Sequence, residues 1–227
     1  MTVIQSKSTF SRNGASTDLY LVRHGETDYN RDGIVQGSGI DSVLNETGRA
    51  QAQALADRLA DASVDAVYAS TLRRAKQTAT VAARPHEPVS KTFLRDLEEI
   101  SWGIFEGEAP SPTRDDAMQA VKERWRAGEY EHAMEGGESI RDVQARALRA
   151  MEHVVAREAG RTVLVVAHGR YLRILLASVL DDYSLADMHR LDHANTCVNH
   201  VEYRRGRFRA ATLNCTAHLP VGTGTDR

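Results

Sequence analysis

The sequence predicts an α/β protein, a three-layer α/β/α sandwich around a mainly parallel, mixed sheet. Two patterns carry this prediction. Short apolar runs typical of buried strands alternate along the chain with longer segments whose apolar residues recur at helical spacing. Near the end of the chain, apolar runs at 198–203 and 208–213 flank Arg205-Gly206, which is typical of an antiparallel hairpin. A hairpin added to parallel strands makes the sheet mixed.

The clearest strand is 162–167, TVLVVA, which is apolar on both faces, as expected of a central parallel strand. An earlier strand covers Leu19 to Val22 and runs into Arg23, His24 and Gly25. The remaining elements continue the alternation. They are a helix at 47–60 capped by Asn45 or Thr47, a strand at 64–68, a helix at 71–83 capped by Ser70, a strand at 89–94, a helix at 140–158 that begins with a Ser139 and Asp142 capping box, and a helix at 170–180.

The composition, with 227 residues, 41% apolar and 26% charged, is that of a globular protein. We expect one domain at 18–215 between flexible tails at 1–17 and 216–227, with a partner-binding extension as the alternative for the first tail. The net charge of −2 provides no overall positive field for nucleic acid or an anionic membrane. The expected partner is therefore a small molecule. The oligomeric state stays open, and a homodimer is compatible with the sequence.

The expected location is the cytoplasm. Only two cysteines occur, Cys197 and Cys215, which are too few for a disulfide framework. Residues 1–17 contain no apolar run of the length of a signal-peptide core, and no run of 18 apolar residues occurs in the sequence.

Arg23 and His24 follow the first predicted strand, and ligands bind at the carboxyl ends of strands in open α/β sheets. The Arg guanidinium is a planar fork of donors that matches phosphate oxygens, and a neutral imidazole can attack phosphorus. This pair of side chains therefore suits phosphoryl transfer. An ordinary surface Arg beside a hydrogen-bonded His is the alternative, and the pair alone does not decide between them.

The stretch that contains this pair, RHGETDYN, resembles the signature of the histidine phosphatase superfamily, which is also called phosphoglycerate-mutase-like. Further motifs of that family follow in the expected order: STLRRAKQTA at 70–79, LEEISWGIFEG at 97–107 and VVAHG at 165–169. The resemblance spans roughly 18–215. It implies the family's three-layer fold and phosphoryl transfer through a histidine.

The resemblance also assigns catalytic roles. His24 is the expected nucleophile, and a backbone carbonyl should orient its ring. Arg23 and Arg74 are expected to bind the phosphoryl oxygens, His168 to donate to the same group, and Glu99 to protonate the leaving oxygen.

Two of these assignments depend on register. The family spacing S-x-L-x-R-A runs from Ser70 and selects Arg74, so that Arg73 should face solvent. Glu99 matches the family's acid, and an acid that acts near neutral pH should be partly buried, whereas Glu98 should be solvated.

The substrate-binding residues implied by the resemblance lie around the catalytic ones, with ordinary loop chemistry as the alternative. Arg170 either contacts a second anionic group of the substrate or faces solvent. Arg146 and Glu26 are weaker candidates for supporting roles. The complete substrate-binding set is Asn30, Gln36, Gly37, Trp102, Gly169 and Arg170.

The function expected is hydrolysis of a small phosphorylated metabolite, either a sugar phosphate or a phosphoglycerate-like ester. EISWGIFEG resembles the phosphatases of the family, whereas mutases carry Arg after the acid and Asn after the second His-Gly, where this chain has Ile100 and Arg170. The alternatives are a cofactor-dependent phosphoglycerate mutase and a catalytically idle member that binds phosphorylated ligands. The segment 108–138 is expected to be a partly helical insertion that covers the site and sets specificity.

A zinc site is the remaining alternative for one cluster. Its members have the spacing H-x3-H-x3-C-x2-H, which zinc ligands use. A helix-to-strand transition interrupts the run, and the chemistry of the family requires no metal. We therefore expect neither a metal nor a resident cofactor. The cluster consists of His189, His193, Cys197 and His200.

Overall fold

A computed structural model describes residues 16–220 of the chain, so most of the two predicted tails lies outside the described residues. The core of the fold is a six-stranded sheet in the order β3-β2-β4-β1-β5-β6. Its strands are β1 (Thr17–Arg23), β2 (Ala66–Ser70), β3 (Ser90–Leu94), β4 (Thr162–Ala167), β5 (Val198–Arg204) and β6 (Arg207–Cys215).

The sheet is parallel over four strands and antiparallel at one edge. β1 pairs with β4, β4 with β2, and β2 with β3, all in parallel. β5 then pairs antiparallel with β1, and β6 pairs antiparallel with β5. The predicted mixed sheet with a closing hairpin is therefore confirmed.

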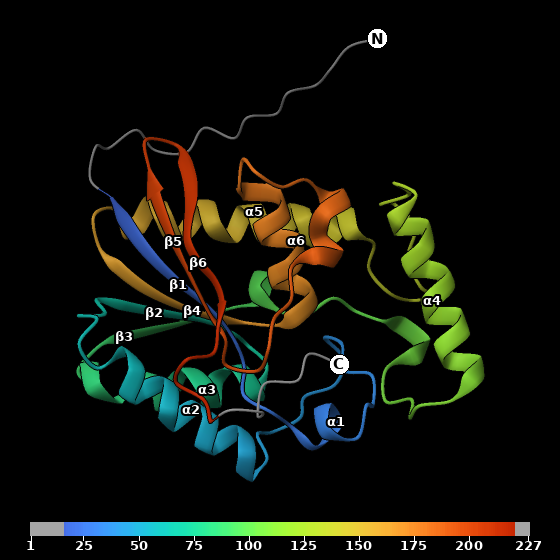
Figure 1. Ribbon diagram of the computed structural model, residues 1–227, viewed down its shortest axis with the longest axis horizontal. Helices are drawn as coiled ribbons and strands as arrows, with labels where there is room; N and C mark the ends of the chain where they lie inside the picture. Colours follow the sequence, from blue (N-terminus) through green and yellow to red (C-terminus); the bar gives the residue numbers. More distant parts are fainter. Residues whose placement is uncertain (1–15, 221–227) are drawn as a thin grey trace.

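Helices cover both faces of this sheet. Figure 1 shows α2 and α3 on one face and α5 and α6 on the other, which confirms the three-layer prediction. The α-helices are α1 (Asp28–Arg31), α2 (Glu46–Leu59), α3 (Arg73–Ala82), α4 (Pro112–Arg126), α5 (Ile140–Arg157) and α6 (Gly169–Val179). Four short 3-10 helices accompany them: η1 (Arg84–His86), η2 (Arg95–Leu97), η3 (Gly103–Phe105) and η4 (Leu185–Arg190).

The side chains of each central strand divide between two cores because successive residues point to opposite faces. In β1, Leu19 and Leu21 belong to the core that α5 and α6 cover. Val22 belongs to the core beneath α2 and α3, together with Leu55 and Ala79 of those helices. Burial on both faces holds the strands rigidly, so their carboxyl ends are fixed positions for functional side chains.

The helix caps agree with the sequence in two places and differ in one. Asn45 rather than Thr47 caps α2, and Ser139 forms the predicted capping box with Asp142. The prediction that Ser70 caps α3 was wrong. Ser70 pairs with Leu94 as the last residue of β2, because the strand extends further than its apolar run indicates.

The insertion is partly helical, as predicted. Its helix α4 begins at Pro112 and is capped by Ser111. Figure 1 shows α4 at the right of the view, apart from the sheet. Trp125 of α4 is buried, and its ring lies 5.7 Å from that of Trp102, which anchors the insertion to the body of the fold. Within residues 16–220, no helix combines the length and apolar character needed to cross a membrane.

Candidate active site

The two histidines of the sequence motifs meet at the ends of β1 and β4. The strands are parallel neighbours with Arg23 opposite Ala167, and the backbone N–H of His24 donates to the carbonyl of Ala167 at 3.0 Å. His168 is the next residue after Ala167. The centroids of the His24 and His168 rings therefore lie 5.1 Å apart, and both side chains are buried.

The ring of His24 is oriented by the chain that follows it. Its Nδ1 lies 2.7 Å from the carbonyl oxygen of Gly25, so Nδ1 carries the proton and Nε2 keeps its lone pair. Burial, followed by the charges of Arg74 and Arg23, holds the pKa of His24 well below its usual value. The imidazole is therefore neutral at neutral pH, which is the form that can act as a nucleophile.

Arg74 is the buried member of the adjacent pair Arg73 and Arg74. It projects from α3 and is fully buried, whereas Arg73 is exposed, as the register argument predicted. Its Nη1 donates to the carbonyl of Ile40 at 2.6 Å and its Nη2 to that of Gly37 at 3.2 Å. Its Nε has no hydrogen-bond partner among residues 16–220. Burial lowers the pKa of Arg74 to about 10, so its charge persists at neutral pH.

Arg23 is held against the start of α6. It donates from Nη1 to the carbonyl of His193. A Cβ added at Gly169 would lie 3.3 Å from Nε of Arg23, so the glycine allows the guanidinium to approach the helix backbone closely. These contacts bring Arg23 and Gly169, both predicted from the motifs, into one place.

His168 is fully buried, and neither of its ring nitrogens has a hydrogen-bond partner within the described part of the chain. Burial is the largest cause that holds its pKa well below the usual value, followed by the charges of Arg74 and His24. A buried polar group without a partner costs about 1–3 kcal/mol. Such a group beside two arginines indicates a site whose hydrogen bonds are completed by an anionic ligand.

Glu99 lies at the first turn of α6 and is buried, as predicted. Its carboxylate accepts hydrogen bonds from the backbone N–H groups of Arg170 at 3.0 Å and Tyr171 at 2.9 Å. These residues follow His168 and Gly169 in the first turn of α6, so the carboxylate lies at the end of α6 that His168 caps. Glu98 is half-buried and accepts a hydrogen bond from the Thr71 hydroxyl, so the prediction that it is solvated was wrong.

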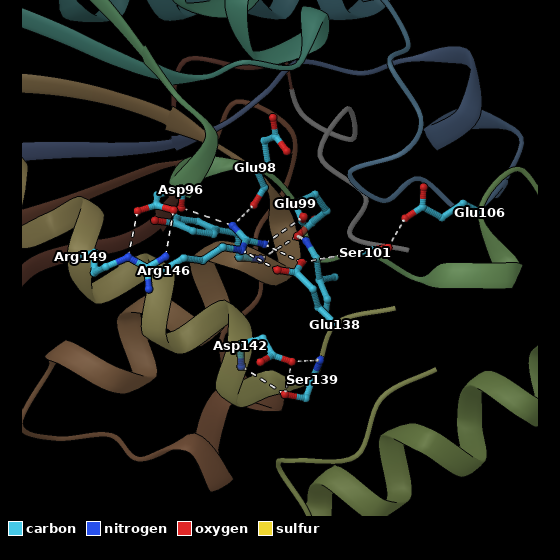
Figure 2. Close-up of polar contacts among 12 residues, drawn as sticks. Asp96, Glu98, Glu99, Ser101, Glu106, Glu138, Ser139, Asp142, Arg146 and Arg149 are labelled. Carbon is cyan, nitrogen blue, oxygen red and sulfur yellow. Dashed lines mark hydrogen bonds and ion pairs between the residues drawn. The ribbon is translucent and has the colours of Figure 1, made fainter. Parts of the chain in front are cut away.

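Arg146 of α5 positions the segment that carries Glu99, as Figure 2 shows. It donates to the backbone carbonyls of Glu98 and Glu99 and forms an ion pair with Glu138. Arg146 was only a weak supporting candidate in the sequence because nothing in the spacing ties it to a residue 47 positions away. Glu26, the other weak candidate, accepts a hydrogen bond from Asn45 at the start of α2.

Three predicted substrate residues hold the loop beside the site. The side-chain oxygen of Asn30 takes part in a capping box with Thr27. The oxygen of Gln36 accepts from the hydroxyls of Thr27 and Ser42. Gly37 offers its carbonyl to Arg74. Contact with substrate stays a prediction for all three.

Glu106 belongs to the site's framework, although sequence reasoning gave it no role. Its carboxylate accepts from the Ser101 hydroxyl and the Trp102 backbone N–H. A Cβ at Gly37 would lie 1.9 Å from its Oε1, which explains the glycine at that position. The signal was present, because Glu106 is the Glu of the motif that ends EG.

Arg170 connects the site to the insertion. Its guanidinium lies over the rings of Trp102 and Trp125, at 5.9 and 5.8 Å from their centroids. Trp102 is buried beneath it. The alternative of an Arg that merely faces solvent is therefore wrong, and contact with substrate stays a prediction for Arg170 and Trp102.

Two imidazoles of the zinc alternative contact other groups. His200 bonds to Asp18 at 2.7 Å and stacks on Tyr20, and Nδ1 of His193 lies 3.1 Å from the carbonyl oxygen of Leu191. Across residues 16–220, no group of three or more His, Cys, Asp or Glu side chains is arranged to hold a metal ion.

A comparison with protein families identifies the chain. The model of the histidine phosphatase superfamily (branch 1) matches residues 19–216. The chain belongs to this superfamily. All five proposed catalytic residues lie within the matched range, and the recognition made from the sequence motifs is confirmed.

Individual relatives within the superfamily carry the names of phosphatases and of phosphoglycerate mutases. A metal-independent phosphoserine phosphatase of Arabidopsis thaliana is 31% identical over 89% of this chain and 83% of its own. The structure of mycobacterial glucosyl-3-phosphoglycerate phosphatase has a TM-score of 0.77 and 30% identity, covering 88% of this chain and 100% of its own. A probable phosphoglycerate mutase of Salmonella choleraesuis (strain SC-B67) is 29% identical over 85% of this chain and 88% of its own. The predicted enzyme class, a phosphomonoester hydrolase of this superfamily, is confirmed at this level.

Proposed function

We propose that the protein hydrolyses a small phosphorylated metabolite through a phosphohistidine on His24. The observation that carries this proposal is the pair of buried imidazoles beside Arg74, with both ring nitrogens of His168 and Nε of Arg74 lacking partners within residues 16–220. A dianionic phosphoryl group supplies acceptors for the Nε–H of Arg74 and for the one N–H that a neutral His168 carries. The phosphatases among the relatives support the same reaction.

The first step is an attack on phosphorus by Nε2 of His24. The N–P bond forms as the bond from phosphorus to the leaving oxygen breaks. Glu99 transfers its proton to that oxygen, which leaves as an alcohol. Arg23, Arg74 and His168 bind the phosphoryl oxygens, and they offset the negative charge that these oxygens carry in the transition state.

The second step is hydrolysis of the phosphohistidine. Water attacks phosphorus, the N–P bond breaks, and His24 recovers its lone pair. Glu99, now a carboxylate, accepts a proton from the attacking water. Inorganic phosphate leaves, and the enzyme returns to its starting protonation state.

The electrostatics of the site suit both requirements of this reaction. After burial, the guanidinium of Arg74 is the next cause of the low pKa of His24 and also of His168, so the same charge helps to keep the nucleophile neutral and attracts the phosphoryl group. Burial strengthens both effects because little water screens the charges.

A phosphoglycerate mutase is the second candidate, because several relatives carry that name. The mutase reaction would need the phosphohistidine to be protected from water and a second oxygen of the substrate to receive the group. Ile100 and Arg170 stand where the mutase pattern has Arg and Asn, which favours hydrolysis.

The setting of the enzyme is part of the proposal. We place it in the cytoplasm, where the thiols of Cys197 and Cys215 would stay reduced. The domain limits at 18 and 215, a small-molecule substrate rather than nucleic acid or membrane, and a homodimer as the compatible assembly stay predictions.

The test is a phosphate-release assay on 4-nitrophenyl phosphate, sugar phosphates, 3-phosphoglycerate and phosphoserine. The wild-type protein should release phosphate from at least one ester, and H24A should be slower by about 10³-fold or more. H153A removes an exposed histidine of α5 and serves as the matched control. If no ester yields phosphate while a bisphosphoglycerate-dependent isomerisation proceeds, the mutase is the correct assignment.

A further inference from the structure

A cavity of about 180 Å³ lies between the insertion and α6, and none of the catalytic candidates lines it. Its walls come from α4, from α6 and from η4. Four of the lining side chains are cations: Lys122 and Arg126 of α4 and Arg170 and Arg173 of α6. The others are Gln119, Trp125, Leu185, Ala186, Met188 and His189. None of these lining residues is acidic.

The four cations act on one another across this space. Lys122 is half-buried, and its pKa is lowered, chiefly by burial and then by the charges of Arg170, Arg126 and Arg173. Two carboxylates that do not line the cavity act on these cations. Asp192 lies 3.6 Å from Arg173 with an exposed carboxylate, and Asp115 favours the charged form of Lys122 only as the weakest of the causes.

Like charges that line one cavity repel one another and attract an anion. An anion in the cavity would accept hydrogen bonds from several of the cations and remove their mutual repulsion. A carboxylate or a phosphate group fits a space of this volume, and the guanidinium groups match the geometry of both.

Arg170 joins this cavity to the proposed active site. Its backbone N–H donates to the carboxylate of Glu99, while its side chain lines the cavity over Trp102 and Trp125. Arg170 therefore contacts the Glu99 carboxylate through its backbone and the cavity through its side chain.

We propose that this cavity is an anion-binding site for a carboxylate or phosphate group. The group comes either from the far end of the ester whose phosphoryl group is at His24, in which case the inference rests on the proposed function, or from a separate small anion. Both sources share the same recognition by Lys122 and the three arginines, and two experiments distinguish them.

The first experiment measures substrate preference. Glycerol 3-phosphate differs from 3-phosphoglycerate by having a hydroxymethyl group in place of the carboxylate. If the ester supplies the anion, K122Q should lower the ratio of kcat/KM for 3-phosphoglycerate to that for glycerol 3-phosphate about tenfold, as expected for one charge-assisted hydrogen bond. R124Q removes one positive charge from an exposed position of the same helix that does not line the cavity, and it should keep the wild-type ratio.

The second experiment measures binding of citrate, a phosphate-free polycarboxylate, by calorimetry. K122Q should weaken citrate binding about tenfold, and R124Q should not. A loss of citrate binding without a change in substrate preference assigns the cavity to a separate anion. If K122Q and R124Q behave alike in both experiments, the inference is overturned. The citrate measurement needs no turnover, so failure of the proposed hydrolysis would be seen separately, as an absence of phosphate release from both esters.

Discussion

The histidines and Arg23 at the ends of β1 and β4, with Arg74 at the start of α3, are buried and held beside the sheet. The cations around α4, in contrast, lie on helix faces along a cavity that is open to solvent. Arg74 is fully buried and donates to two backbone carbonyls. Arg126 is exposed, and Lys122 is half-buried.

This difference indicates a division of roles. Groups that must meet one phosphorus atom need positions that do not vary, and parallel strands buried on both faces provide them. Groups that select among substrates need only present charge of the right sign, for which a surface helix is sufficient. Changes at the sheet ends should therefore affect turnover of every ester, and changes on α4 should affect the choice of ester.

The largest effect among the supporting residues is expected at Arg74. R74Q removes a buried charge beside the phosphoryl group and should lower kcat/KM about 10³-fold for all hydrolysed esters. R73Q, one position earlier and exposed, should change it by less than about twofold. We would measure kcat/KM by steady-state assays on two esters and verify folding by circular dichroism. Equal losses in the two variants would contradict the register assignment.

Glu99 should come next. E99Q cannot supply a proton and should lower kcat about 10²-fold for alkyl phosphates, whose leaving oxygen must be protonated. The loss should be smaller for 4-nitrophenyl phosphate, because nitrophenolate leaves without a proton. E98Q alters the neighbouring carboxylate and should retain most of the activity. A larger loss in E98Q than in E99Q would place the acid one residue earlier.

Arg146 should have an intermediate effect, through position rather than contact with substrate. R146M leaves the carbonyls of Glu98 and Glu99 without their donor and Glu138 without its ion pair. We expect kcat to fall about tenfold with KM changed little, and the free energy of unfolding to fall by about 2 kcal/mol.

The control for this prediction is R149Q, one turn further along α5. Arg149 forms an exposed ion pair with Asp96, so its loss should cost less than about 1 kcal/mol. Urea unfolding and steady-state kinetics on both variants provide the comparison. An R146M protein with normal kcat would show that Glu99 needs no support from α5.

The smallest effect concerns stability and pH. The pKa values of His24 and His168 are lowered in the folded state, so below about pH 6.5 the unfolded chain binds protons that the folded chain does not. Stability should therefore decrease as pH falls, by about 1 kcal/mol per histidine between pH 6.5 and 5.5. Unfolding of H168Q should show a weaker pH dependence than that of wild type, whereas H153Q should match wild type. Identical slopes in all three would mean that His168 titrates normally.

Much of this architecture could be predicted from the sequence, because the strong signals are local. The apolar run at 162–167 and the helical spacing of apolar residues within 140–158 reflect burial, and the four motifs carry the site residues in a recognisable order. The motif register correctly predicts that Arg74 is more buried than Arg73 and that Glu99 is more buried than Glu98.

The features that could not be predicted depend on contacts between distant segments. The end of β2 at Ser70 is set by pairing with β3, the half-burial of Glu98 by Thr71, and the role of Arg146 by the approach of α5 to the Glu99 segment. The cavity lined by Lys122 and the three arginines lies between α4 and α6, and the sequence does not reveal that these two helices lie close together.

The most direct test of the account is to trap the covalent intermediate. The enzyme is mixed with a ³²P-labelled ester, quenched in alkali, in which phosphohistidine survives, and digested for mass spectrometry. Hydrolysis through a phosphohistidine on His24 predicts label on the imidazole of His24 in wild type and in E99Q, and no label in H24A. Label on any residue other than His24, including His168, would contradict this mechanism.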